Sequence, residues 1–418
     1  LVGSEMCIRD RYILNKIKHL QQNLNLIKQK GLLIMINSST WAEINLENIR
    51  YNVNSVKNAL KDETKLCCVI KANAYGHGAV EVAKFLEKEN VDFFSVARLE
   101  EGLELSQNNI KTPILCMGYI DSCKLQHAID NNIRITVYSL EMAENINSLA
   151  KTSNKKAYVH IKLDTGMSRI GFLVNDNSIN DIKKIFNFEN IIVEGIYTHF
   201  AKADEANKDA TFHQISKYNE VIKALESDNL NVPIKHVSNS AAILDLRDCD
   251  FNMVRLGISL YGCYPSDDVS REVDLKTCLE LKTKISNVKT IEKGTSVSYG
   301  GTYTVDKDTK IATIPIGYAD GFPRTQKNPK AFVNGRLVNI VGRICMDQTM
   351  LEIPNDLDVN TEDVVTLIGN IDGIKIGNIS QNVDTIDHEV LCNINRRVNR
   401  IYLSNDDKYT VSYTLSND

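Results

Sequence analysis

The alternation of apolar, strand-like runs with helical stretches, sustained from residue 41 to about residue 275, constrains the fold of this chain more than any other feature. Helical stretches such as Val80–Glu89, Glu141–Ala150 and Thr211–Leu225 separate most of the apolar runs. Eight parallel-type strands with intervening helices predict an α/β fold, a (β/α)8 TIM-like barrel, with a doubly wound open sheet as the alternative. The runs lie near residues 66–70, 93–97, 113–117, 134–138, 157–163, 191–198, 234–238 and 253–257.

The sequence pattern changes after about residue 275. Runs rich in β-branched residues follow one another, with turns such as Asn334-Gly335 and Asp372-Gly373 between or after them, and a helix is expected only at Ile374–Gln381. This pattern predicts a mostly β C-terminal domain. We therefore assign residues 35–275 to the barrel and residues 276–418 to the second domain. The strand-like runs of the second domain are Leu281–Ile291, Lys310–Ile316, Arg336–Ile340 and Asp363–Ile368.

The first 34 residues are left out of this division. Residues 1–11 resemble translated sequencing-adapter sequence, and residues 12–34 are polar and rich in Lys, Gln and Asn. We expect residues 1–34 to be a non-native or disordered extension and Met35 to be the natural start.

The amino-acid composition argues against several classes of function. The net charge is −4 and 24% of the residues are charged, so we expect neither nucleic acid nor a membrane as a partner. No apolar run approaches the roughly 20 residues that a membrane span needs. The 10 cysteines include no C-x-x-C pair, which argues against a zinc site and indicates reduced thiols. We therefore expect a cytoplasmic protein without a metal.

Lys71 is the residue that points most directly to chemistry. It follows the apolar run Leu66–Ile70 and precedes the small, glycine-rich stretch ANAYGHG. A partly desolvated lysine loses its charge more readily, and its free amine is then available for Schiff-base chemistry. The alternative is a lysine that simply ends a strand in solvent.

Other polar side chains are predicted at the same end of the barrel, where barrel enzymes place their reactive groups. Each has an ordinary structural explanation alone, such as a core histidine for His199 or an ion-pair partner for Arg255. Together with Lys71 they indicate an amine, a polar pocket and small residues that a phosphate could approach, which favours pyridoxal phosphate and leaves the reaction open. The set includes Tyr75, Lys162, Asp164, Arg169, His199, Asp204, Ser240, Arg255 and Gly257.

Nine ordered sequence blocks resemble the barrel-type, fold type III pyridoxal-phosphate family of alanine racemases, over about residues 39–403. Members of this family are expected to interconvert L-alanine and D-alanine, to supply D-alanine for peptidoglycan, and to act as homodimers with shared active sites. The blocks are VIKANAYGHG, KLDTGMSRIG, THFAKADE, NSAA, MVRLGISLYG, VSYGGTY, PIGYADGFPR, GRICMDQ and CNINRRVNRIY.

The resemblance implies a role for individual residues. Lys71 would hold the cofactor and act as one base, and Tyr299, from the partner subunit, would be the opposing base. Arg255 would contact the pyridine nitrogen, and Lys162 matches a lysine that can be carbamylated. The other cofactor contacts would be Tyr75, Arg169, His199, Ser240, Gly257, Ile258 and His388. The substrate contacts would be Arg169, Tyr318, Arg343, Met346 and Asp347, with Asp204, His236 and Arg324 around the entrance.

One position departs from the family pattern. His388 stands where relatives usually have a tyrosine that contacts the phosphate region and braces the catalytic tyrosine. A protonated histidine there would favour the phosphate, but its side chain is shorter. One alternative is a racemase of broader or serine preference. A second is a barrel-type decarboxylase, which the Tyr299 block and Arg255 argue against, and a third is a non-catalytic pyridoxal-phosphate-binding protein, which residues 281–403 argue against.

Overall fold

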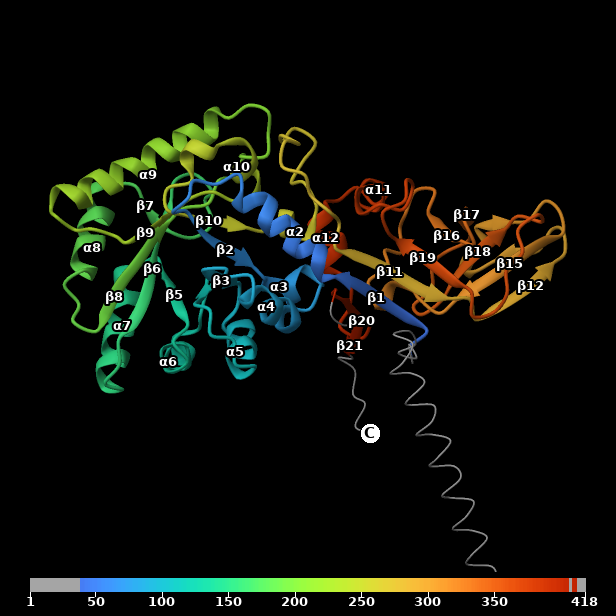
Figure 1. Ribbon diagram of the computed structural model, residues 1–418, viewed down its shortest axis with the longest axis horizontal. Helices are drawn as coiled ribbons and strands as arrows, with labels where there is room; N and C mark the ends of the chain where they lie inside the picture. Colours follow the sequence, from blue (N-terminus) through green and yellow to red (C-terminus); the bar gives the residue numbers. More distant parts are fainter. Residues whose placement is uncertain (1–37, 406–407, 412–418) are drawn as a thin grey trace, which may run out of the picture.

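The computed structural model describes residues 38–405 and 408–411, so the extension predicted for residues 1–34 lies outside the described residues. Two large sheets organise this part of the chain: a parallel barrel wrapped by helices, and an elongated, largely antiparallel sheet beside it (Figure 1). A third, two-stranded sheet pairs β13 (Ser296–Val297) with β14 (Tyr303–Thr304). Among the described helices, none has the length and apolar character needed to cross a membrane.

The barrel predicted from the sequence is confirmed, and a strand occupies each of the eight predicted runs. Neighbouring strands in the order β10-β2-β3-β4-β5-β6-β8-β9 pair in parallel, and a short β7 (Phe172–Leu173) pairs with β6. Two backbone hydrogen bonds, Asn252 N to Lys235 O at 3.3 Å and Arg255 N to Ser238 O at 3.0 Å, join the two ends. The strands are β2 (Lys65–Val69), β3 (Phe93–Val96), β4 (Ile114–Cys116), β5 (Arg134–Val137), β6 (Ala157–Asp164), β8 (Ile191–Tyr197), β9 (Ile234–His236) and β10 (Met253–Leu256).

Amphipathic helices cover the outside of the barrel. In α7 (Leu140–Thr152), Ser139 caps the first turn by accepting a hydrogen bond from Met142 N, and Ala143, Ile146 and Ala150 are buried at helical spacing. The three predicted helical stretches correspond to α4 (Ala79–Glu87), α7 and α9 (Asp209–Ser227). The other helices of this half are α2 (Leu46–Lys57), α3 (Lys71–Tyr75), α4 (Ala79–Glu87), α5 (Leu99–Gln107), α6 (Leu125–Asp130), α8 (Asp176–Ile185), α9 (Asp209–Ser227) and α10 (Ser240–Asp245), with short 3-10 turns η1 (Ser122–Lys124), η2 (Arg247–Cys249) and η3 (Ile258–Tyr261).

The second sheet includes β1 (Thr40–Asn45), which falls inside the range 35–275 predicted for the barrel. β1 pairs antiparallel with β11 (Leu279–Lys284) and parallel with β20 (Asn399–Leu403). The predicted range is wrong at this strand, because the residues within a short strand do not specify distant partners such as these. The 10-stranded order is β12-β15-β18-β17-β16-β19-β11-β1-β20-β21.

Two further details of the second domain differ from expectation. The predicted run Leu281–Ile291 is two strands, because β11 pairs with β19 whereas β12 (Asn287–Ile291) pairs with β15. The helix α12 (Asp387–Cys392) follows the expected α11 (Ile376–Asn382). Asn334-Gly335 forms the predicted turn, with φ of 46° and 84°. The remaining elements are β13 (Ser296–Val297), β14 (Tyr303–Thr304), β15 (Thr309–Ile314), β16 (Lys330–Val333), β17 (Arg336–Ile340), β18 (Thr349–Ile353), β19 (Val364–Ile368), β21 (Lys408–Val411), η4 (Tyr299–Gly301) and η5 (Tyr318–Asp320).

A buried arginine joins the second sheet to the barrel. Arg400, on β20, has 0% of its surface exposed and donates to Gly76 O at 3.1 and 3.0 Å and to Ile394 O at 2.8 Å. Two residues along the same strand, Tyr402 Oη donates to His77 O at 3.0 Å. Because Gly76 and His77 follow closely after Lys71, the second domain holds the segment that carries this lysine.

We expect Arg400→Met to lower the free energy of unfolding by about 2–4 kcal/mol, because the buried carbonyls of Gly76 and Ile394 lose their donor. Arg396→Met is the matched control: Arg396 is half exposed and pairs with Glu104, so its replacement should cost about 1 kcal/mol or less. Urea unfolding followed by circular dichroism measures both. Equal losses for the two variants would contradict the role of Arg400.

Candidate active site

Lys71 begins a left-handed turn. Isolated left-handed residues other than glycine are uncommon, and each costs on the order of 1 kcal/mol or more. Backbone hydrogen bonds hold this turn, from Gly76 N to Ala72 O at 3.1 Å and from Gly78 N to Asn73 O at 2.8 Å. The sequence predicts only a loop here, and the small side chains are its sole signal of the turn. The left-handed residues are Ala72 (φ 51°), Asn73 (φ 55°), Ala74 (φ 53°) and Tyr75 (φ 50°).

Packing from three elements keeps this turn in place. A Cβ at Gly76 would lie 2.2 Å from Leu391 O of α12, so only glycine allows that approach. From α5, Glu101 accepts a hydrogen bond from Ala72 N at 2.6 Å, while β20 supplies Arg400. The backbone at Lys71 is therefore fixed by both domains.

The environment of Lys71 lowers the pKa of its amine. Burial lowers the pKa of Lys71, and the positive charge of Arg169 lowers it further, whereas Cys392 and Glu101 act in the opposite direction. A lowered pKa increases the neutral fraction at any pH near neutrality. This matches the desolvated lysine that the sequence predicts.

Hydroxyl groups and backbone amides converge next to the lysine turn. Ser240 Oγ accepts hydrogen bonds from Gly257 N at 2.9 Å and from Ser259 N at 3.4 Å. A Cβ at Gly257 would lie 3.3 Å from Tyr75 Oη and 3.5 Å from Ser240 Oγ, so the absence of a side chain leaves a small space lined by two hydroxyls. Hydroxyl and amide donors around such a space suit a phosphate, and these residues fit pyridoxal phosphate.

Arg255 is buried inside the barrel. Its Nη1 donates to His236 Nδ1 at 3.0 Å, and its Nη2 donates to Thr198 O at 2.8 Å and Val237 O at 2.9 Å. The expected position of His236 at the entrance is wrong. His236 is fully buried in the barrel, where its ring stacks on Tyr197 at 4.7 Å, because alternate residues of a barrel strand point inward.

His199 is a neutral hydrogen-bonding group. Burial lowers its pKa well below the ordinary value, and the charge of Arg255 acts in the same direction. Arg255 Nη2 lies 3.4 Å from His199 Nδ1, and a guanidinium can only donate. Nδ1 is therefore the acceptor, and the ring proton is on Nε2, where His199 can donate to another group.

His388 of α12 lies close to the phosphate space. Its ring centre is 5.9 Å from that of Tyr75. Burial lowers the pKa of His388, and the nearby Lys71 lowers it further, so the imidazole is neutral near pH 7. The protonated form considered from the sequence is therefore disfavoured.

Lys162 projects into the barrel from β6. Burial lowers its pKa to about 7, and the charge of Arg255 also lowers it. Its Nζ lies 5.5 Å from the centre of the Tyr197 ring and donates to Leu163 O at 2.5 Å. A substantial fraction of this lysine is therefore uncharged at neutral pH.

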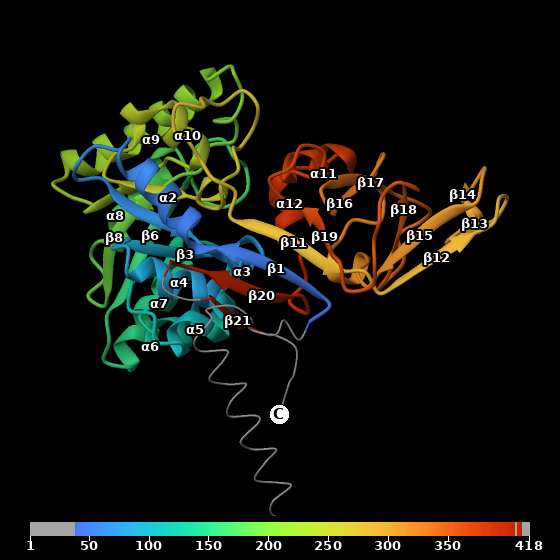
Figure 2. The same cartoon turned by 45° about the vertical axis from the view of Figure 1, so that its right-hand side comes forward.

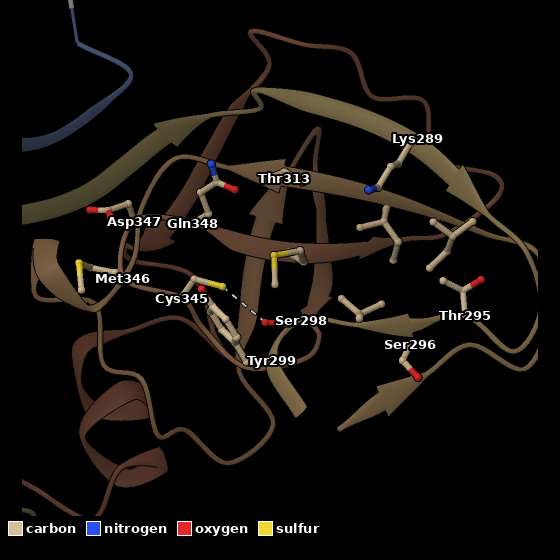
Figure 3. A pocket seen from close by; sticks show the side chains of 14 residues that line it. Lys289, Thr295, Ser296, Ser298, Tyr299, Thr313, Cys345, Met346, Asp347 and Gln348 are labelled. Atoms are coloured by element: carbon tan, nitrogen blue, oxygen red, sulfur yellow. Dashed lines mark hydrogen bonds between the residues drawn. The ribbon is translucent and has the colours of Figure 1, made fainter. Parts of the chain in front are cut away.

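A second group of predicted residues gathers in the other domain. Tyr299 lies in η4 with 67% of its surface exposed, next to a hollow of about 580 Å³ that Cys345, Met346 and Asp347 also line (Figure 3). Ser298 Oγ donates to Arg343 O at 2.5 Å and so holds the tyrosine loop against the Arg343 segment.

A backbone hydrogen bond holds Tyr318 next to the segment that contains Cys345 and Met346. Tyr318 N donates to Cys345 O at 3.1 Å, and Tyr318 itself is 42% exposed. Arg397 bridges Asp320 and Asp347, each at 2.7 Å. The carboxylate of Asp347 is thus already engaged by an ion pair, a contact that the sequence does not reveal.

A single chain does not unite the two groups. Figure 2 shows β13 and β14, which flank Tyr299, at the far end of the second domain from α3, where Lys71 lies. The barrel group consists of Lys71, Tyr75, Lys162, Arg169, His199, Asp204, Ser240, Arg255, Gly257, Ile258 and His388. The distal group consists of Tyr299, Tyr318, Arg343, Met346 and Asp347.

Both halves of the chain match known family models. Residues 44–265 match the alanine racemase N-terminal domain, and residues 278–402 match the alanine racemase C-terminal domain. The chain belongs to the alanine racemase family. Alanine racemase of Methanococcus maripaludis is 44% identical over 373 residues, covering 88% of this chain and 100% of that protein.

Solved structures of this family also match most of this chain. An alanine racemase structure from Clostridium difficile 630 is 49% identical, with a TM-score of 0.88 over 91% of this chain and 100% of the other. The Bacillus anthracis alanine racemase with bound L-Ala-P is 33% identical, with a TM-score of 0.85 over 90% of this chain and 98% of the other. Enzymes of this family use pyridoxal 5'-phosphate as cofactor.

We expect Gly257→Ala to weaken cofactor binding by about tenfold or more, because its methyl group would occupy the space between the Tyr75 and Ser240 hydroxyls. Absorbance titration of the apoenzyme with pyridoxal phosphate measures the dissociation constant. Gly377→Ala is the control, since its Cβ would meet only Asp387 Oδ1 at 4.0 Å. Unchanged affinity at position 257 would exclude this space as the phosphate site.

Proposed function

We propose that this protein interconverts L-alanine and D-alanine and so supplies D-alanine for peptidoglycan. The observation that carries the proposal is Lys71, held by both domains beside a space lined by hydroxyls and amides, with its pKa lowered. We place the protein in the cytoplasm, as predicted from the sequence. Chiral analysis of the product formed from L-alanine tests the activity directly, and a wild-type protein that forms no D-alanine would overturn the proposal.

Pyridoxal phosphate would be bound by the barrel group. Lys71 would bind it covalently, with Tyr75, Ser240 and the backbone of Gly257 and Ile258 around its phosphate. When bound, it withdraws electrons from the substrate and stabilises negative charge at the α-carbon. Arg255 would donate a hydrogen bond to the ring nitrogen and keep its own proton, because a guanidinium does not deprotonate near neutral pH. Arg169, His199 and His388 would complete the cofactor contacts.

Racemisation needs a proton removed from one face of the α-carbon and another returned to the opposite face. Lys71, whose pKa is lowered by burial, would take or return the proton on its own face. The Tyr299 phenol would act on the other face. A single base would favour retention, so the reaction requires both groups.

We infer that the active form is a homodimer in which each barrel receives Tyr299 of the partner subunit. Support comes from the separation of Tyr299 and Lys71 within one chain and from the exposure of the distal group, in which Met346 is 54% exposed. Tyr318, Arg343, Met346 and Asp347 would come with Tyr299 to the substrate, and Arg324 and Asp204 would lie near the entrance.

A mixed dimer of Lys71→Ala and Tyr299→Phe subunits should recover activity that each pure variant lacks. Tyr299→Phe should reduce racemisation by about 10²–10⁴-fold, the range of a positioned acid–base group. In an equal mixture, half of the dimers are mixed and each has one intact site, so roughly a quarter of the wild-type activity should return. No recovery after co-expression would argue for a self-contained site.

Substrate preference within the family is a separate question. The distal residues Tyr318 and Met346 lie on exposed turns, and loops of this kind can vary without changing the barrel. A racemase of broader or serine preference is therefore the second candidate. Comparing kcat/KM for L-alanine and L-serine decides between them. The match over residues 278–402 argues against a barrel-only pyridoxal-phosphate-binding protein.

We expect Lys162 to form a carbamate with carbon dioxide, because its pKa of about 7 leaves a neutral amine. The carbamate signal in carbon-13 spectra of the protein with labelled bicarbonate should grow as the pH rises through about 7, since the neutral amine increases in that direction. It should be absent from Lys162→Met. A signal of equal intensity in that variant would assign the carbamate to another amine.

A further inference from the structure

A continuous chain of hydrogen bonds runs through the barrel interior to Arg255. Glu194 Oε2 of β8 lies 3.1 Å from His160 Nε2 of β6. His160 Nδ1 lies 2.9 Å from His236 Nε2 of β9, and His236 Nδ1 lies 3.0 Å from Arg255 Nη1. At the other end, Arg134 of β5 donates to both oxygens of Glu194, at 3.1 and 3.3 Å.

The groups at the two ends, Arg255 and Glu194, fix which atom donates in every hydrogen bond between them. Arg255 can only donate, so His236 Nδ1 accepts and the His236 proton is on Nε2. That proton is donated to His160 Nδ1, which leaves the His160 proton on Nε2, directed at Glu194. An ionised carboxylate can only accept, so the Glu194 end requires the same arrangement.

The surroundings support two neutral imidazoles ending at an ionised carboxylate. His160 and His236 are fully buried, and burial lowers the pKa of both. Burial raises the pKa of Glu194, but the hydrogen bonds from His160 and Arg134 outweigh it and the net pKa is lowered.

The fold also makes room for this series of hydrogen bonds. A Cβ at Gly195 would lie 2.3 Å from His160 Nδ1, so glycine at this position admits the imidazole ring. Among the described residues, no carboxylate forms a direct ion pair with Arg255. The hydrogen bonds through two imidazoles therefore connect the buried guanidinium to the carboxylate of Glu194.

We propose that Glu194 is a positioning residue for the racemase reaction: through His160 and His236 it fixes which ring nitrogens carry protons, and so holds the Arg255 guanidinium toward the ring nitrogen of the cofactor. This inference rests on the proposed function. Glutamine at position 194 carries no charge and would share its single carbonyl oxygen between His160 and Arg134. It would therefore accept more weakly and hold the two imidazoles, and through them the Arg255 guanidinium, less firmly.

The test compares Glu194→Gln, Glu194→Asp and the control Glu43→Gln. Glu43 is also a carboxylate on a strand, with 16% of its side chain exposed. It pairs with Lys282 at 2.7 Å and takes no part in the series of hydrogen bonds that ends at Arg255. Glu194→Gln should lower kcat by about 10–100-fold, the usual cost of losing an outer hydrogen-bond partner, with little change in KM. It should also shift the nitrogen-15 resonance of labelled cofactor. Glu194→Asp, which keeps the charge, should retain more activity, and Glu43→Gln should match wild type.

Nitrogen-15 spectra of the histidines supply a measurement that needs neither cofactor nor turnover. The cofactor-free wild type should show His160 and His236 neutral with protons on Nε2, and Glu194→Gln should weaken the hydrogen bond from His160 and shift the His160 Nε2 resonance. Protons on Nδ1 in the wild type would overturn the inference, even where the variants fail to fold. A wild-type rate together with an unchanged cofactor resonance in Glu194→Gln would also overturn it. Neither result bears on the proposed racemase activity, which fails only when the wild type itself forms no D-alanine.

Discussion

The contact between Arg400 and the carbonyl of Gly76 is the interaction on which the barrel site depends. A left-handed run of four residues other than glycine is costly alone, so surrounding contacts must stabilise it. Arg400 and Tyr402 reach the backbone of this segment from the second sheet, and α12 closes over Gly76. The geometry of Lys71 is therefore a property of both domains, although every residue of the turn belongs to the barrel.

Burial near cations determines the electrostatics of the site. Lys71 and Lys162 lie near Arg169 or Arg255 in the barrel, and the pKa of each lysine is lowered. The same combination makes His199 neutral. The site thus contains amines with lowered pKa values and neutral imidazoles beside guanidiniums that stay charged. Such an environment can accept an anionic cofactor and still provide a base, which a cluster of fully charged lysines could not.

Much of the barrel could be predicted from the sequence, because buried parallel strands are short apolar runs and their order follows the chain. The placement of Lys71, Ser240 and Arg255 follows from the same rule, since reactive groups lie at strand ends. The pairing of β1 with β11 and β20 could not be predicted, because it joins residues far apart in the sequence. The burial of His236 and the ion pair of Asp347 with Arg397 also depend on distant partners. Glu194 carries no local signal, since a lone glutamate in a strand is usually a surface residue.

The position of β1 has a consequence for how the protein is made. The ribosome releases this strand early, but its partners begin at Leu279 and Asn399. At typical rates of synthesis β1 waits on the order of ten seconds or more before either partner emerges. The barrel strands can pair with one another during that delay. β1, in contrast, has unpaired backbone N–H and C=O groups on both edges, which can pair with strands of other chains. Nascent chains that stop before the second domain would therefore be prone to aggregate and would depend on chaperones.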